Sequence, residues 1–146
     1  MIQWRWNSTG TTVAGINSSL GTTTTQLNSP SGLIMDTSNT LYISDRYNHR
    51  VQKWLIGASN STTVAGLYNG TASSTLNGLN SPNDVAVDSS GNLYVADTMN
   101  HRVLLWTTGA SSGILYAGNG KTSCRTANFV SFLLSTISTK LKFKVN

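Results

Sequence analysis

Two histidines, His49 and His101, are the residues of this 146-residue chain best suited to acid–base chemistry or metal binding. Both occur in nearly the same setting, within the sequences SDRYNHRVQKW and ADTMNHRVLLW. In each, an Asp stands four residues before the His and an Arg directly after it. A carboxylate beside an imidazole could move protons, and imidazole nitrogens are common metal ligands. The same constellation could instead build a turn between two strands.

Other catalytic signatures are absent from the sequence. It contains no glutamate, no phosphate-binding P-loop, no G-x-S-x-G elbow and no H-E-x-x-H motif. Acid–base chemistry would have to use the histidines or the aspartates. Asp36 and Asp88 open equivalent turns, where a carboxylate caps backbone N–H groups. Asp84 is the acid for which a structural role is least evident, because the equivalent position of the first repeat is Gly32 and not an acid.

The charge distribution argues against nucleic-acid binding. The chain carries a formal net charge of +5, and charged residues make up 10% of it. Residues 1–118 are neutral, since their five basic residues match the five acids. The whole excess follows Gly118, at Lys121, Arg125, Lys140, Lys142 and Lys144. The repeats described below therefore offer no net positive field to phosphates, and we do not expect nucleic acid as a partner.

Cellular compartment is not assigned by the sequence. Cys124 is the single cysteine, so no intrachain disulfide can form. The first ten residues lack the apolar run of a secretory signal, and FVSFLL at 129–134 is too short to span a bilayer. N-x-[ST] sequons fit either a secreted parent protein or chance in a chain rich in Asn, Ser and Thr; they begin at Asn7, Asn17, Asn60 and Asn69.

An internal repeat organises the chain. Residues 29–54 align without gaps on residues 81–106, 52 positions later. TTVAG at 62–66 recurs as LYAG at 115–118 and occurs earlier at 11–15. A unit of about fifty residues is thus present twice, preceded by the end of a third.

Four short strands are expected in each unit, which makes the chain all-β. Tight links rich in Gly and Asn separate them, with Gly91 and Asn39 at positions that favour positive φ. The expected strands centre on Leu33–Met35, Leu41–Ile43, Val51–Trp54 and Thr63–Ala65, and on Val85–Val87, Leu93–Val95, Val103–Trp106 and Leu115–Ala117.

Four strands per unit of this length are typical of a β-propeller blade. SPNDVAVDSSGNLYVADTMNHRVLLW and its first copy resemble the NHL repeat family, whose Asn-His-Leu motif stands here as Asn48-His49-Arg50 and Asn100-His101-Arg102. The resemblance implies four-stranded antiparallel blades of a ring that has mostly six blades in the family, here incomplete. We expect an ending blade at 1–16, blades at 29–66 and 81–118, and an atypical basic tail at 119–146.

The signature residues are interpreted as structural. We expect Asp45 with Arg50, and Asp97 with Arg102, to pair across their hairpins. Asn48 and Asn100 suit a left-handed turn position or a side-chain bond to backbone. Trp54 and Trp106 end the third strand and are expected to fill space between blades.

A metal site is the alternative, because the resemblance extends to propeller lyases of the peptidyl-hydroxyglycine lyase type, which use histidines around a metal. His49 and His101 lie on adjacent blades about 10 Å apart, whereas zinc holds each nitrogen at about 2.0–2.1 Å. No third carboxylate or thiolate ligand is evident. We therefore predict no metal, no cofactor and no enzymatic activity.

The predicted function is a non-catalytic module that binds protein or peptide partners. Family members include the target-recognition parts of RING-type ubiquitin ligases, although this chain has no RING cysteines. Two blades alone expose two apolar faces. We therefore expect either a piece of a longer propeller or self-association, for example three copies forming a six-blade ring.

Overall fold

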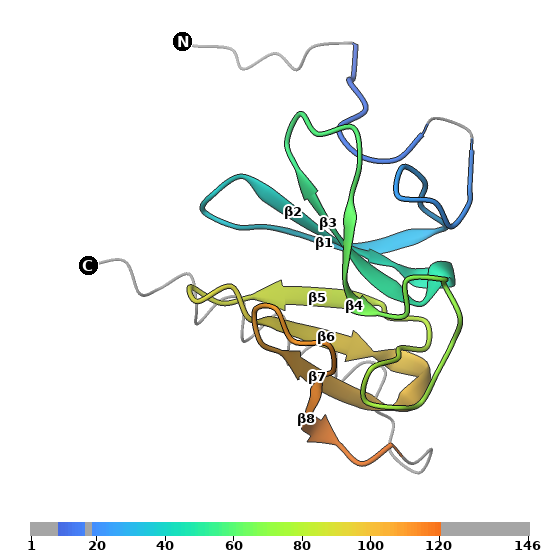
Figure 1. Cartoon of the computed structure of the whole chain (residues 1–146), viewed down its shortest axis with the longest axis vertical. Coiled ribbons are helices and arrows are strands. Elements are labelled where there is room, and N and C mark those ends of the chain that lie inside the picture. The colour runs from blue at the N-terminus through green and yellow to red at the C-terminus, as the bar shows by residue number, and fades with distance from the viewer. Residues whose placement is uncertain (1–8, 17–18, 121–146) are drawn as a thin grey trace, which may run out of the picture.

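The computed structural model describes residues 9–16 and 19–120, which form two four-stranded antiparallel sheets (Figure 1). The first sheet, blade 1, has the order β1-β2-β3-β4, and the second, blade 2, has the order β5-β6-β7-β8. The strands are β1 (Pro30–Met35), β2 (Thr40–Asp45), β3 (Arg50–Leu55), β4 (Thr62–Gly66), β5 (Asp84–Val87), β6 (Leu93–Asp97), β7 (Arg102–Trp106) and β8 (Ile114–Gly118). All eight expected strands are therefore confirmed, as is the all-β fold class.

One short 3-10 turn joins the second and third strands of each blade. These turns are η1 (Arg46–Asn48) and η2 (Thr98–Asn100). They lie at the same end of both blades as the linker 67–83, which leaves β4 beside Arg50 and enters β5. The turns and the linker thus form one continuous end of the molecule, which we call the turn face.

The links between the first and second strands have the predicted chemistry. Asp36 Oδ1 accepts the backbone N–H groups two and four residues further on, at 2.8 and 2.9 Å, and Asp88 makes the equivalent bonds. Asn39 and Gly91 have φ angles of 59° and 79°. The predicted capping aspartates and positive φ angles are thus present.

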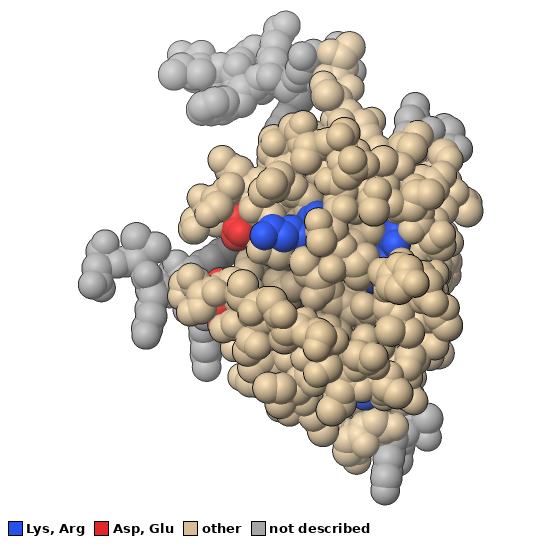
Figure 2. Space-filling view, viewed as in Figure 1, with Lys and Arg blue, Asp and Glu red and all other residues tan. Residues whose placement is uncertain are grey.

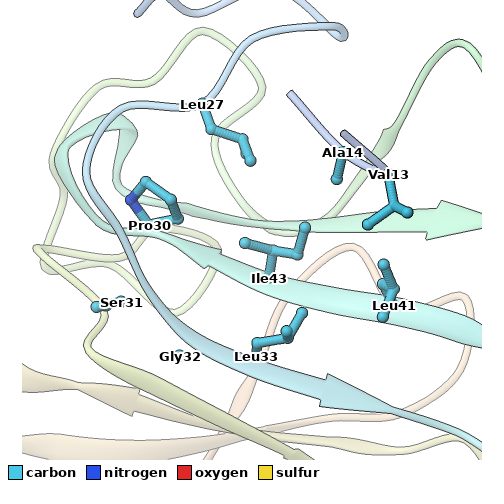
Figure 3. A pocket seen from close by; sticks show the side chains of 9 residues that line it. All are labelled: Val13, Ala14, Leu27, Pro30, Ser31, Gly32, Leu33, Leu41 and Ile43. Atoms are coloured by element: carbon cyan, nitrogen blue, oxygen red, sulfur yellow. The ribbon is translucent and has the colours of Figure 1, made fainter. Parts of the chain in front are cut away.

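The main core lies between the two blades. Its buried residues come from both sheets and from the linker: Tyr42, Val51, Ala65, Leu79, Val85, Leu93, Val95, Leu104 and Trp106. Tyr42 and Val51 face blade 2, whereas Leu41, Ile43 and Trp54 face away from it in a separate cluster. Among residues 9–16 and 19–120, blade 1 is therefore covered on one side by blade 2 and on the other mainly by the segment before β1 (Figure 3).

Residues 9–16 form no strand, although 11–15 repeat the sequence of β4. Ala14 and Leu27 pack on the cluster of Leu41, Ile43 and Trp54. The remainder of the expected blade end at 1–8 lies outside the described residues. So do Cys124 and the basic tail beyond residue 120.

Candidate functional site

The Asp and Arg of each signature form a buried ion pair. Asp45 ends β2 directly opposite Arg50, which begins β3, so the antiparallel register sets their side chains together. Arg50 Nε lies 2.9 Å from Asp45 Oδ2, and the two side chains are 1% and 0% exposed. Arg102 and Asp97 form the equivalent pair at 2.7 Å. The ion pairs predicted across both hairpins are therefore present.

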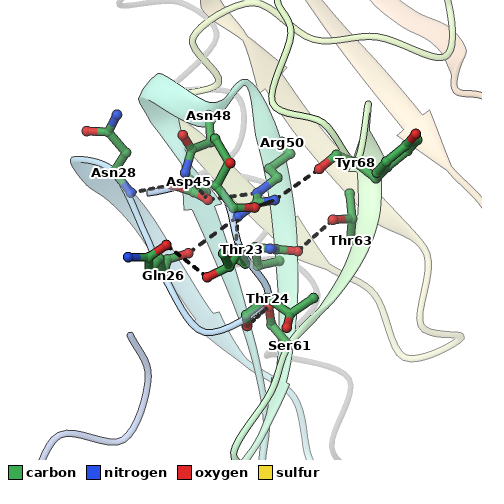
Figure 4. A network of polar contacts seen from close by, with 12 residues as sticks. Thr23, Thr24, Gln26, Asn28, Asp45, Asn48, Arg50, Ser61, Thr63 and Tyr68 are labelled. Carbon is green, nitrogen blue, oxygen red and sulfur yellow. Dashed lines mark hydrogen bonds and ion pairs between the residues drawn. The ribbon is translucent and has the colours of Figure 1, made fainter. Parts of the chain in front are cut away.

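Each guanidinium also binds backbone carbonyls of the segment that enters its blade. Arg50 donates to the carbonyl oxygens of Thr22, Thr23 and Gln26 in that segment, and also to that of Tyr68, which follows β4 (Figure 4). Arg102 donates to the carbonyl oxygens of Ser74, Thr75 and Gly78, which all lie in the linker that enters blade 2. A planar guanidinium with five donors suits this fan of acceptors, which a lysine could not match. Its donors are thereby used within the protein.

The asparagines complete the same network. Asn48 Nδ2 donates to Asp45 Oδ2 and to the carbonyl of Gly21, and Asn100 makes the equivalent bonds in blade 2. The other carboxylate oxygen of Asp97 accepts the Asn80 N–H at 2.6 Å. Burial raises the pKa of Asp97, while the bonds from Asn100, Asn80 and Arg102 lower it. The signature residues thus tie each turn to the segment that precedes the blade.

The histidines occupy the left-handed position of each turn, with φ angles of 51° at His49 and 52° at His101. The alternative that places Asn48 or Asn100 there is wrong, because both asparagines lie in the 3-10 turn and use their side chains instead. His49 Nδ1 accepts the backbone N–H of Ser81 at 3.0 Å. Burial lowers the pKa of His49, opposed by Asp97 and Asp45. His49 is therefore an acceptor between blades.

No metal-binding cluster is found in the described residues: no three His, Cys, Asp or Glu side chains of 9–16 and 19–120 are grouped to hold an ion. The same part of the chain has no helix long and apolar enough to cross a membrane.

Asp84 lies where the first strands of the two blades meet. Its Oδ1 accepts the N–H of Val85 at 2.9 Å, and burial raises the pKa of its carboxyl. Gly32 of β1 lies against it, since a Cβ built on Gly32 would be 2.6 Å from the Asp84 Cα. The Gly at this position in the first repeat thus has a steric reason, which the aligned repeats alone did not indicate.

The turn face also carries exposed side chains at positions that differ between repeats. Tyr47 and Met99 are equivalent and are 53% and 57% exposed, and Tyr68 of the linker is 81% exposed. The guanidinium carbon of Arg46 lies 5.3 Å from the centre of the Tyr47 ring. Figure 2 shows that charged side chains are sparse on the side of the molecule in view. The turn face therefore combines apolar and aromatic groups with one half-buried arginine on η1.

Two sheets of four antiparallel strands, each locked by the same Asp-Asn-Arg network, define a repeat protein built from propeller blades. The sequence model of the NHL repeat matches residues 27–54 and 79–104. These two segments are NHL repeats.

Curated relatives agree with this assignment. The chain is 36% identical over 84 residues to NHL repeat-containing protein 2 of Bos taurus, and 38% identical over 84 residues to that of Homo sapiens. Each alignment covers 53% of this chain and 12% of the relative. The chain thus corresponds to a small part of the relatives it matches.

Proposed function

We propose that this chain is a non-catalytic NHL-repeat module that binds a protein or peptide partner through its turn face. The observation that carries the proposal is a difference in burial within each turn: the side chains common to both repeats are buried, and the variable one is exposed. The side chains of Asp45, Asn48 and Arg50 are buried in bonds to the blade and its entering segment, whereas Tyr47, between them, points to solvent. The positions that both repeats share thus stabilise the blade, whereas the variable positions are exposed and available to a partner.

The exposed residues have the chemistry of a protein interface. Tyr and Met are enriched at such interfaces. Tyr brings a large apolar area at a small entropic cost, and the flexible, polarizable side chain of Met adapts to the shape of a partner. Tyr47 and Met99 lie on adjacent blades, and the His49–Ser81 hydrogen bond joins the turn of blade 1 to the loop that enters blade 2. A partner could therefore contact both blades at once. NHL repeats commonly mediate protein interactions, which fits this surface.

The second hypothesis, a propeller lyase, receives no specific support from the described residues. His49 Nδ1 is bonded to Ser81, and the nearest acids, Asp45 and Asp97, are engaged by Arg50 and Arg102. The matched relatives are named for NHL repeats, and nothing in those names points to a ubiquitin ligase.

A selection of displayed random peptides against the immobilised full chain tests the proposal. We expect enriched peptides whose binding falls at least tenfold in Tyr47→Asp and Met99→Asp. Ile56→Asp is the matched control, because Ile56 is 51% exposed and lies between β3 and β4, at the opposite end of blade 1. Peptides that lose binding equally in the control, or in no variant, would contradict binding at the turn face.

A further inference from the structure

Arg46 is the cation of the turn face that forms no ion pair within the described residues. The lysines and arginines of this part of the chain are Arg46, Arg50, Lys53 and Arg102. Arg50 and Arg102 are paired with buried aspartates, and Lys53 lies opposite Thr62, at the other end of blade 1. The buried network thus compensates its own charges, and no described carboxylate compensates Arg46.

The Arg46 guanidinium is half-buried and has hydrogen-bonding capacity to spare. Its Nε atom is covered and has no hydrogen-bond partner among the described residues. The guanidinium carbon lies 5.3 Å from the centre of the Tyr47 ring, within the range of a cation–π contact. A charge that is partly removed from water is costly unless an anion pairs with it. The guanidinium is therefore suited to receive an anion from a ligand.

The backbone of η1 holds Arg46 and Tyr47 in place. The Tyr47 N–H donates to the Asn28 carbonyl at 3.1 Å, and the Arg46 carbonyl accepts the His49 N–H at 3.2 Å. The buried ion pair fixes both ends of the same turn. A ligand thus meets a cation and an aromatic ring on a rigid turn, which lowers the entropic cost of binding.

The turn of blade 2 differs in its chemistry. Thr98 stands where Arg46 stands in blade 1, and its hydroxyl donates to the Ala96 carbonyl at 3.3 Å. Its neighbour Met99, equivalent to Tyr47, is exposed. A partner that spans both turns therefore meets a cation and an aromatic ring on blade 1, but an apolar and flexible side chain on blade 2.

We propose that the turn face binds an acidic peptide, and that Arg46 receives the carboxylate of an Asp or Glu of that peptide. The guanidinium fork fits a carboxylate in a bidentate pair. A polyproline II segment presents the same side every three residues, about 9 Å, and packed sheets lie about 10 Å apart. An apolar residue three positions from the acid therefore reaches Met99. This assignment rests on the proposed function and adds the chemistry of the partner.

A phosphate would also fit a guanidinium, but the surrounding charge favours a peptide carboxylate. Residues 1–118 contain five basic and five acidic residues and carry no net charge. Nucleic-acid binding relies on several phosphate contacts made by Lys and Arg. One uncompensated arginine beside apolar side chains suits a single carboxylate next to an apolar residue instead.

Two displayed peptide libraries, selected against the full chain, test this assignment. They are identical except that one fixes Glu and the other fixes Gln at the central position, with random residues on both sides. We expect at least tenfold more enrichment from the Glu library, with an apolar residue three positions from the Glu. Replacing that Glu by Gln in the best peptide should weaken binding at least tenfold.

Variants of the chain assign the carboxylate to Arg46. Arg46→Met should weaken binding of the Glu peptide at least tenfold and leave the Gln peptide unchanged, and Arg46→Lys should restore part of the loss. Lys53→Met is the matched control and should leave binding unchanged, because Lys53 forms no ion pair within the described residues but lies away from the turn face.

The outcomes separate this assignment from the proposed function. Peptides that depend on Tyr47 and Met99 but bind equally with Glu or Gln overturn the acidic peptide and leave the proposed function standing. Enrichment from neither library overturns both. Equal losses in Arg46→Met and Lys53→Met overturn the role of Arg46. Tighter, Arg46-dependent binding of an oligouridine overturns the acidic peptide in favour of nucleic acid.

Discussion

His49 Nδ1 accepts a hydrogen bond from the backbone N–H of Ser81, 3.0 Å away, which joins the turn of blade 1 to the loop that enters blade 2. Both residues have positive φ angles, 51° and 49°. A buried N–H that loses its acceptor costs about 1–3 kcal/mol. The imidazole therefore contributes to the joint between blades only while Nδ1 is unprotonated.

The stability of the chain should depend on this protonation. Burial holds the pKa of His49 below its ordinary value of 6.5 in the folded protein. The unfolded chain then binds the proton first as the pH falls, so the free energy of unfolding is highest above pH 6.5 and decreases below it. Urea unfolding at pH 7.5 and pH 5.5 measures the decrease. It should be smaller in His49→Gln, and an equal decrease in both proteins would refute the role of His49.

Loss of either signature arginine should lower the free energy of unfolding strongly. Arg102→Met leaves the Asp97 carboxylate buried without its cation, which costs about 3–5 kcal/mol of unfolding free energy. Arg50→Met should cost a similar amount. Arg46→Met is the control, since among the described residues this half-buried guanidinium forms no ion pair with a carboxylate and lies over the Tyr47 ring, so its loss should change stability by less than about 1 kcal/mol. Equal losses for Arg46 and Arg102 in urea unfolding would contradict the assigned roles.

Gly32 should not tolerate a side chain. A Cβ in Gly32→Ala would meet the backbone of Asp84 and force β1 away from β5, at a cost of about 1–3 kcal/mol. Gly10→Ala should leave stability almost unchanged, because no atom lies within 4 Å of its Cβ position. Thermal unfolding of the two variants distinguishes them, and a neutral Gly32→Ala would show that the blades are less closely packed.

Two leucines at the same position of the two repeats, Leu79 and Leu27, should contribute differently to the stability of the chain. Leu79 is 0% exposed in the core between the blades, so Leu79→Ala should cost about 2–5 kcal/mol. Leu27 occupies the same position before blade 1, where it is only partly buried among the described residues and packs on Leu41, Ile43 and Trp54. We expect Leu27→Ala to cost less than half as much. Similar values in chemical denaturation would contradict this difference in burial between the two leucines.

Local sequence was sufficient to predict the strands and the ion pairs. Short apolar runs and Gly- or Asn-rich links mark all eight strands, and the hairpin spacing places Asp45 opposite Arg50. The contacts of the arginines with the entering segments were not predicted. Arg50 binds the carbonyls of Thr22 and Gln26, while Arg102 binds those of Ser74 and Gly78. Backbone carbonyls are present whatever the side chain, so these segments diverge in sequence and leave no motif.

The bond between His49 and Ser81 escaped prediction for a related reason. Its donor is a backbone N–H more than thirty residues away, and its acceptor depends on a left-handed His that the turn sequence suggested for Asn48. The exposed positions do leave a signal in the sequence, since RY at 46–47 and TM at 98–99 differ between the Asp and the Asn-His-Arg that both repeats share.

The central claim is that repeated turn residues build the blades while variable ones bind a partner. The most direct measurement compares Met99→Asp and Arg102→Met for two properties, urea unfolding and affinity for a display-selected peptide. We predict that Met99→Asp lowers affinity at least tenfold with unchanged unfolding free energy, and that Arg102→Met lowers the unfolding free energy by about 3–5 kcal/mol. Unchanged affinity in Met99→Asp together with unchanged stability in Arg102→Met would contradict the claim.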